Sequence, residues 1–321
     1  MPASWRCTFA ACAYVRADPI PTRGARTGGP ADAPLRAALA EVCRACDLDP
    51  AGAQLIRHVN NAVFRLDRDP VVVRLVTLPS YVPRSELAVR AATWFAEHDV
   101  PAIRLLPGVV QPLRVGDQVA TLWQEVLEVG PTPGGGELAG ILRTLHALPA
   151  PDGVFPGWEP LVDLDNRLAD TPALSQADRS FLQRRCDELA AAASKLVFAL
   201  PRAVLHGDAH LGNVISGPDG PVLCDFDSCC VGPPEWDLTP MAVSAVRFGR
   251  PAVHQRDLAA RYGLDVTAWE GFDVLRGIRD LKIVAGAFPG RDRGPAVAAE
   301  FERRMASLRS GRTGDRWSLL R

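Results

Sequence analysis

The chain has 321 residues, enough for two lobes with separate cores, because single hydrophobic cores stop growing near roughly 250 to 300 residues. Its 47% hydrophobic and 23% charged residues are close to globular averages and exclude a fibrous or wholly disordered chain. A net charge of −1 excludes the strong positive field that gathers nucleic acid or an anionic membrane, so a charged partner must be recognised locally.

Neither a membrane span nor an export signal is recognisable in the sequence. No stretch approaches the roughly 18 consecutive apolar residues that cross a bilayer, and the N-terminus has no apolar core followed by a small-residue cleavage site. We therefore expect a cytoplasmic protein, monomeric or dimeric, without nucleic acid or membrane partners.

The N-terminal part changes from a tail to a helix and then to strands. Residues 1–34 are rich in Ala, Pro, Gly and Arg without any period, which is typical of a flexible tail. Apolar residues at helical spacing then predict a short helix over 35–48. Three short apolar or alternating runs follow and predict an antiparallel meander, at residues 55–59, 62–66 and 71–76.

A helix and a hairpin complete this first lobe. Apolar residues from Leu87 to Phe95 repeat at helical spacing after Pro83. The following hairpin is predicted to have a strand at Val109–Val110, a turn at Gly116–Asp117 and a second strand over 118–124. The Pro/Gly-rich stretch 130–136 then indicates a linker.

Beyond the linker, helical patterns dominate. They are found at residues 138–148, 161–168, 178–200 and 272–285. Strand-like pieces interrupt them at residues 204–205, 214–215 and 222–224. We therefore predict an α+β protein with a tail (1–34), a small antiparallel-sheet N-lobe (35–129) and a larger helical C-lobe (130–321).

The most informative segment runs from Leu205 to Asp227. Two apolar strands flank a turn at 217–220, so the ends of a hairpin would bring Asp208, Asn213 and Asp225 together. Phosphoryl transfer from ATP needs a carboxylate to orient the attacking hydroxyl, and Asn and Asp oxygens to hold Mg²⁺ against the phosphates. The D-x-x-x-x-N spacing from Asp208 to Asn213 is that of a kinase catalytic loop.

This segment resembles the catalytic loop of the aminoglycoside phosphotransferase family, which consists of protein-kinase-like small-molecule kinases. The family pattern H-G-D-x-x-x-x-N starts at His206, its I-D-[FW]-[DG] element corresponds to 224–227, and a D-L element matches Asp237-Leu238. The resemblance implies a two-lobed kinase that uses Mg²⁺ and ATP, with GTP left open as donor. It implies that Asp208 is the catalytic base and that Asn213 and Asp225 bind the metal.

The same resemblance assigns nucleotide-binding roles in the N-lobe. Asn60 and Asn61 occupy the loop that covers the phosphates, here without glycines. Arg74 stands where the family usually has a phosphate-binding Lys, and Glu86 would pair with it across the cleft. The hinge at 124–127 would meet adenine through backbone groups, with Gln124 and Val126 as the contacts.

Further roles follow from the resemblance for the acidic residues of the C-lobe. Asp227 would add a second metal contact or orient the loop, and Asp237 would fix the catalytic loop by hydrogen bonds. The acceptor would meet Glu159, Asp163 and His210, and the acid-rich segment from Trp158 to Asp165 suits a cationic acceptor such as an aminoglycoside. A solvated helix face explains that segment equally well.

Several alternatives remain open from the sequence. Glu86 could pair with Arg90 on a solvated helix face. His206, Asp208 and His210 could be ligands of a metal hydrolase, although that site would need further histidines. At the level of function, a metabolic kinase for a sugar, choline-like amine or amino alcohol shares every motif, and a nucleotide-binding pseudokinase would bind ATP without turnover.

Overall fold

The computed structural model of the chain describes residues 32–58, 61–162, 164, 168, 171, 174–286 and 294–319. The chain divides into two compact units. The first, here called the sheet unit, runs to Pro133 and also contains Pro151–Phe155 and Leu211–Cys229. The second, here called the helical unit, contains Gly134–Ala150, Pro156–His210 and the chain from Cys230 onward.

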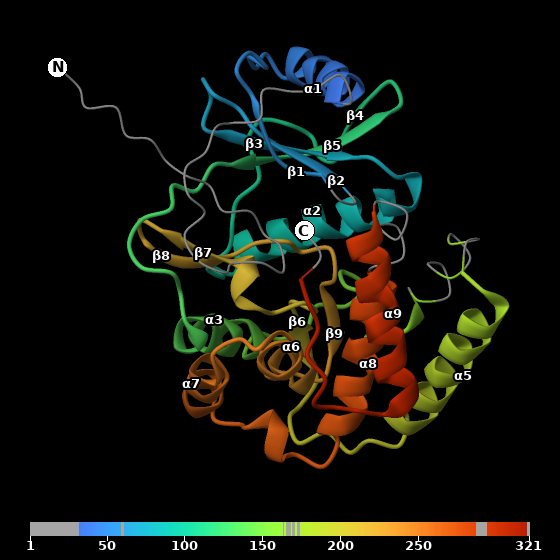
Figure 1. The fold of residues 1–321 in the computed structure, drawn as a ribbon. Helices are drawn as coiled ribbons and strands as arrows, with labels where there is room; N and C mark the ends of the chain where they lie inside the picture. The colour runs from blue at the N-terminus through green and yellow to red at the C-terminus, as the bar shows by residue number, and fades with distance from the viewer. Residues whose placement is uncertain are drawn as a thin grey trace. The chain divides into compact units, whose positions relative to one another are not determined.

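The sheet unit is built on a five-stranded antiparallel sheet with the strand order β1-β2-β3-β5-β4 (Figure 1). Its strands are β1 (Gln54–His58), β2 (Asn61–Arg65), β3 (Val71–Val76), β4 (Leu113–Val115) and β5 (Gln118–Gln124). The predicted antiparallel sheet is confirmed. The predicted position of the fourth strand is wrong: Val110 is 89% exposed, and pairing with β5 begins only at Leu113.

Alternation along the strands gives the sheet two different faces. Helix α1 (Ala33–Ala45) packs Leu39 and Val42 into a core with Phe64, Val73 and Leu122 on one face. Helix α2 (Val82–Glu97), which follows the short 3-10 helix η2 (Pro79–Tyr81), lies on the other side of the sheet (Figure 1).

The hairpin of β7 (Val214–Gly217) and β8 (Gly220–Leu223) belongs to the sheet unit, although the sequence places it in the predicted C-lobe. A parallel bridge joins Ala102 to Leu223, and Val129 N–H donates to the Ser216 carbonyl at 2.8 Å. The predicted turn at 217–220 is confirmed by the pairing of Gly217 with Gly220.

The helical unit combines helices with the short strand pair β6 (Ala203–Leu205) and β9 (Cys230–Gly232). Its helices are α3 (Gly135–His146), α5 (Gln176–Ala193), α6 (Glu235–Phe248), α7 (Ala252–Tyr262), α8 (Phe272–Ala285) and α9 (Pro295–Ser310). Two 3-10 turns are η3 (Leu211–Asn213), which belongs to the sheet unit, and η4 (Val266–Ala268). Most of the predicted helix 161–168 lies outside the described residues.

A glycine allows two of these helices to approach closely. A Cβ atom on Gly135 would lie 1.7 Å from the His254 carbonyl oxygen of α7, so only glycine fits at the start of α3. Among the described residues, no helix is long and apolar enough to span a bilayer.

Candidate active site

In the sheet unit, Arg74 on β3 lies among carboxylates that follow β8. Its Nη1 donates to Asp227 Oδ1 at 2.7 Å and its Nη2 donates to Asp227 Oδ2, so the pair is bidentate. Nη1 also lies 3.6 Å from Asp225 Oδ1. Burial by itself would lower the pKa of Arg74, but the charges of Asp227 and Asp225 outweigh it and raise that pKa above its usual value. Arg74 is therefore a permanent cation.

The two predicted metal-binding residues flank one hairpin. Val214 pairs with Leu223, and Cys224 N–H donates to the Asn213 carbonyl at 3.0 Å, so Asn213 and Asp225 lie at the same open end. The Asp225 backbone has φ of 67°, a left-handed conformation that non-glycine residues rarely adopt and that often marks a functional position. This part of the predicted juxtaposition is confirmed.

Phe226 anchors the carboxylate-bearing segment in the core of the sheet unit. Its side chain is 1% exposed and makes edge contacts with Phe95 of α2 and Trp123 of β5, at centroid distances of 5.1 and 5.8 Å. Aromatic pairs in this geometry are worth about 0.5–1.5 kcal/mol beyond their buried area. Phe226 thus anchors the segment from which the Asp225 and Asp227 carboxylates both reach Arg74.

Glu86 does not pair with Arg74 in this structure, so the predicted ion pair is not formed. Its Oε1 accepts from Arg114 Nη2 at 2.8 Å on the surface, where the Arg114 and Glu86 side chains are 55% and 41% exposed. The reason lies in the register of α2, which turns Ser85 and Ala88 inward and leaves Glu86 facing β4.

The donor set at the hairpin end fits a hard cation. The Asn213 amide and the Asp225 carboxylate offer oxygen atoms, and Mg²⁺ usually takes one or two carboxylates and completes its shell with water and substrate phosphates. Both Asp227 oxygens accept hydrogen bonds from Arg74. Asn213 and Asp225 are therefore the residues that would hold the metal, while Asp227 is engaged elsewhere.

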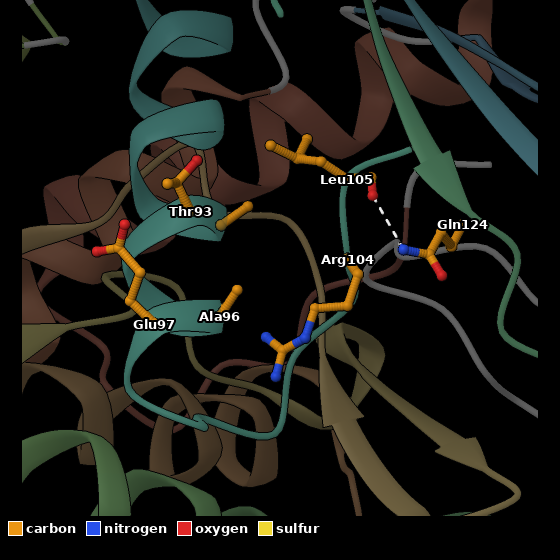
Figure 2. A pocket seen from close by; sticks show the side chains of 7 residues that line it. Thr93, Ala96, Glu97, Arg104, Leu105 and Gln124 are labelled. Atoms are coloured by element: carbon orange, nitrogen blue, oxygen red, sulfur yellow. Dashed lines mark hydrogen bonds between the residues drawn. The ribbon is translucent and has the colours of Figure 1, made fainter. Parts of the chain in front are cut away.

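In the predicted hinge, Gln124 already uses its backbone and side-chain donors in hydrogen bonds within the protein. Gln124 N–H donates to the Arg104 carbonyl at 2.9 Å, and its side chain donates to the Leu105 carbonyl at 3.0 Å. Figure 2 shows this side chain at a hollow of about 440 Å³ beside the C-terminal half of α2. The strand register also puts Gln124 on the sheet face opposite to Arg74, because Arg74 pairs with Thr121 and side chains alternate.

Val126, the other predicted hinge contact, lies after β5 and outside any strand. Its side chain packs beside the β7–β8 hairpin, where a Cβ on Gly217 would lie 3.1 Å from Val126 Cγ1.

Of the two residues predicted to cover the phosphates, Asn61 is the first residue of β2 and is 8% exposed. Asn60 lies outside the described residues.

In the helical unit, Asp208 forms a charge cluster with Arg279 and His210. Arg279 Nη2 of α8 donates to Asp208 Oδ1, and His210 Nε2 lies 3.6 Å from Asp208 Oδ2. Arg279 is 3% exposed, whereas the Asp208 side chain retains 28% exposure. Burial would raise the pKa of Asp208, but Arg279 and His210 outweigh it and hold the pKa well below its usual value.

The loop that carries Asp208 is fixed by Asp237 at the start of α6. Its carboxylate accepts the backbone N–H groups of His206 and Gly207, each at 2.7 Å, and lies 3.2 Å from His146 Nε2. Gly207 has φ of 81°, which glycine adopts without a steric penalty. His146 also contacts the Tyr262 hydroxyl at 2.8 Å, so it joins α3 and α7 to this loop.

The residues predicted to contact the acceptor differ in their burial. His210 is buried beside Asp208. Glu159 has an exposed side chain and follows Trp158, whose backbone N–H donates to the Val231 carbonyl. Asp163 lies outside the described residues.

Sequence reasoning missed Arg279 and Arg57. Arg57 on β1 places its Nη1 3.9 Å from Asp225 Oδ2 and adds a second cation to the sheet-unit cluster. As a basic residue within the predicted strand 55–59, it could have drawn attention from the sequence. Arg279 sits in a helix with other basic residues, and no local pattern distinguishes it from them.

The antiparallel sheet, the helical unit and the loop H-G-D-x-x-x-x-N define a protein-kinase-like fold. A model of the Phosphotransferase enzyme family matches residues 53–277. The chain therefore belongs to the Phosphotransferase enzyme family, the family of aminoglycoside phosphotransferases that the sequence resembles. A search of curated proteins finds no match.

Solved structures share this fold at low sequence identity. An amicoumacin kinase in complex with AMP-PNP and Ca²⁺ is 12% identical, with a TM-score of 0.65 over 88% of this chain and 97% of its own. A choline/ethanolamine kinase family protein from Mesorhizobium loti is 17% identical, with a TM-score of 0.60 over 86% and 94%. An aminoglycoside phosphotransferase from Streptomyces rimosus is 22% identical, with a TM-score of 0.56 over 77% and 98%.

Proposed function

We propose that this protein transfers the γ-phosphoryl group of ATP to a hydroxyl group of a small molecule, with Asp208 as the catalytic residue. The observation that carries the proposal is the Asp208 carboxylate itself, ion-paired to buried Arg279 on a loop fixed by Asp237. A carboxylate at this position of a D-x-x-x-x-N loop accepts the hydrogen bond of the attacking hydroxyl and then its proton.

The depressed pKa of Asp208 defines how it would act. A strongly acidic carboxyl is a weak base, so its first contribution is to orient the acceptor oxygen toward phosphorus, and it takes the proton only as the new O–P bond forms. This order suits phosphoryl transfer, in which positioning and charge stabilisation supply most of the catalysis.

The nucleotide side of the reaction belongs to the sheet unit. Arg74 would hold phosphate oxygens with its planar guanidinium, and the backbone of Val126 would face the adenine ring. Asn213 and Asp225 would hold Mg²⁺, which when bound supplies positive charge to the phosphates. The nucleotide complexes named for structural neighbours, with AMP-PNP, ADP and GDP, support a nucleoside triphosphate as donor and leave GTP open.

A hydroxyl-bearing amine is the acceptor class best supported by these similarities. The structural neighbours include aminoglycoside, choline and aminopropanol kinases. Either an antibiotic or a metabolic amino alcohol satisfies this description.

The test is a screen for acceptor-dependent ADP release. Purified protein with Mg-ATP is offered aminoglycosides, peptide antibiotics, choline, amino alcohols and sugars, and the phosphorylated product of any active compound is identified by mass spectrometry. We expect turnover with at least one hydroxyl-bearing amine and an O-phosphorylated product. Binding of ATP without turnover on any acceptor would instead favour the non-catalytic nucleotide-binding alternative.

A further inference from the structure

We propose that Asp227, rather than a glutamate on α2, is the residue that positions Arg74 for the nucleotide phosphates. This inference rests on the proposed function. The two side chains form a bidentate pair in which Arg74 is 16% exposed and Asp227 is 12% exposed. A paired guanidinium at this depth has its orientation fixed by its carboxylate partner.

The carboxylate of Asp227 belongs to a segment that is anchored in the core of the sheet unit. It directly follows Phe226, which is buried between rings of α2 and β5. The Glu86 carboxylate, in contrast, is at the surface in an exposed pair with Arg114, and such pairs typically contribute only about 0.2–1 kcal/mol.

The entrance of α2 offers no substitute for Asp227. Its first turn contains no acidic residue, and Arg84 there stacks over the Tyr81 ring at 4.7 Å from the centroid. The first turn of α2 therefore supplies no carboxylate to Arg74. Arg74 receives its orienting anion from the segment that follows β8.

Three possible roles for Asp227 make different predictions about the binding of metal-free ATP. A metal ligand influences the nucleotide only when the metal is present. A bystander anion repels phosphate, so its neutralisation strengthens metal-free binding. A residue that positions Arg74 is different, because its neutralisation weakens ATP binding with and without Mg²⁺.

The experiment measures ATP affinity by titration calorimetry, in EDTA and in Mg²⁺, for the wild type, Asp227→Asn, Arg74→Gln, the double variant Arg74→Gln/Asp227→Asn, and Glu86→Gln. We expect Asp227→Asn and Arg74→Gln each to weaken metal-free ATP binding about tenfold or more, the size of one lost charge-assisted hydrogen bond. We expect Glu86→Gln to bind within about twofold of the wild type, as for an exposed surface pair.

The double variant tests whether Asp227 acts through Arg74. In the Arg74→Gln background, Asp227→Asn should cause no further loss of metal-free affinity, or even a gain, because no guanidinium is left to position. This comparison also replaces the single variant if Asp227→Asn fails to fold, since the double variant does not bury an unpaired Arg74.

Four results would overturn the inference: no loss of ATP affinity for Asp227→Asn, a loss for Asp227→Asn in Mg²⁺ only, an equal loss in the Arg74→Gln background, or a loss for Glu86→Gln as large as that for Asp227→Asn. If the wild type binds ATP and Asp227→Asn binds it equally well, this inference alone fails. If the wild type binds no nucleotide, the proposed function fails with it.

Discussion

The charge state of Asp208 is set by its burial and by two neighbouring side chains of the helical unit. Desolvation favours its neutral form, but buried Arg279 and nearby His210 favour the carboxylate more strongly, so the pKa of Asp208 is lowered. Since the folded-state pKa lies below the unfolded value of about 3.9, the carboxylate contributes stability above that pH. This contribution is lost only as the pH falls toward the still lower folded-state pKa. Asp208 therefore stays ionised across the physiological range.

Replacement of Arg279 should make activity sensitive to acid. In Arg279→Gln, desolvation is no longer offset by the guanidinium, so the pKa of Asp208 rises and a larger share of its carboxyl group is protonated as the pH falls. We expect acceptor-dependent ADP release to lose more at pH 5 than at pH 8 relative to the wild type.

Arg276→Gln is the matched control for this pH profile. Arg276 lies on the same helix but pairs with Asp273, whose side chain is 77% exposed. The variant should keep the wild-type pH profile. An Arg279→Gln enzyme with the same fractional loss at every pH would show that Arg279 acts on geometry alone.

Among the helices, buried arginines tie the C-terminal segment to α6, α8 and α9. Arg247 of α6 pairs with Asp280 of α8 through Nε at 3.0 Å and Nη2 at 2.5 Å, and its Nη1 donates to the carbonyls of Arg312 and Asp315. Its guanidinium also stacks over Trp317 at 4.2 Å. The segment after α9 is thereby part of the helical core.

Arg247→Gln should destabilise the helical unit strongly. It leaves the Asp280 carboxylate buried without its cation, which typically costs about 3–5 kcal/mol. Arg312→Gln is the control, because its pair with Asp315 is exposed and should change stability by less than about 1 kcal/mol. Urea unfolding followed by circular dichroism measures both, and similar midpoints for the two variants would contradict this account.

The sequence predicts some elements well and misses others for physical reasons. Helix α8 buries apolar residues at helical spacing, among them Leu275, Ile278 and Leu281, and its predicted bounds 272–285 agree with the structure. Helix α6 was missed because it is buried on nearly all sides and contains Pro240, so it lacks an amphipathic period. In contrast, α7 buries only Leu258, and its polar sequence gives little apolar periodicity.

At the scale of the whole molecule, the chain order does not coincide with the compact units. The linker 130–136 contains the first division, between Pro133 and Gly134, but residues 211–229 return to the sheet unit. Their contacts with Ala102 and Val129 join segments far apart in sequence, and short strands carry no sign of their distant partners.

In the candidate site, too, contacts between residues close in sequence could be predicted, whereas contacts between distant residues could not. Asn213 and Asp225 could be paired from the sequence because one hairpin connects them. The partners Arg279 of Asp208 and Asp227 of Arg74 lie 71 and 153 positions away, and Glu86 was assigned to Arg74 by family resemblance. Whether Glu86 meets Arg74 depends on which face of α2 carries Glu86, and a sequence motif does not show the direction of a side chain around a helix.

In the proposed mechanism, Asp208 acts on the acceptor hydroxyl and does not contribute to nucleotide binding. The most direct test of this mechanism is acceptor-dependent ADP release by Asp208→Asn, with Mg-ATP affinity measured by calorimetry on the same preparation and Asp225→Ala as the comparison. We predict that Asp208→Asn lowers the rate by about 10² to 10⁴ or more while Mg-ATP affinity stays close to that of the wild type. Asp225→Ala should weaken Mg-ATP binding as well. An Asp208→Asn enzyme that turns over at close to the wild-type rate would contradict the account.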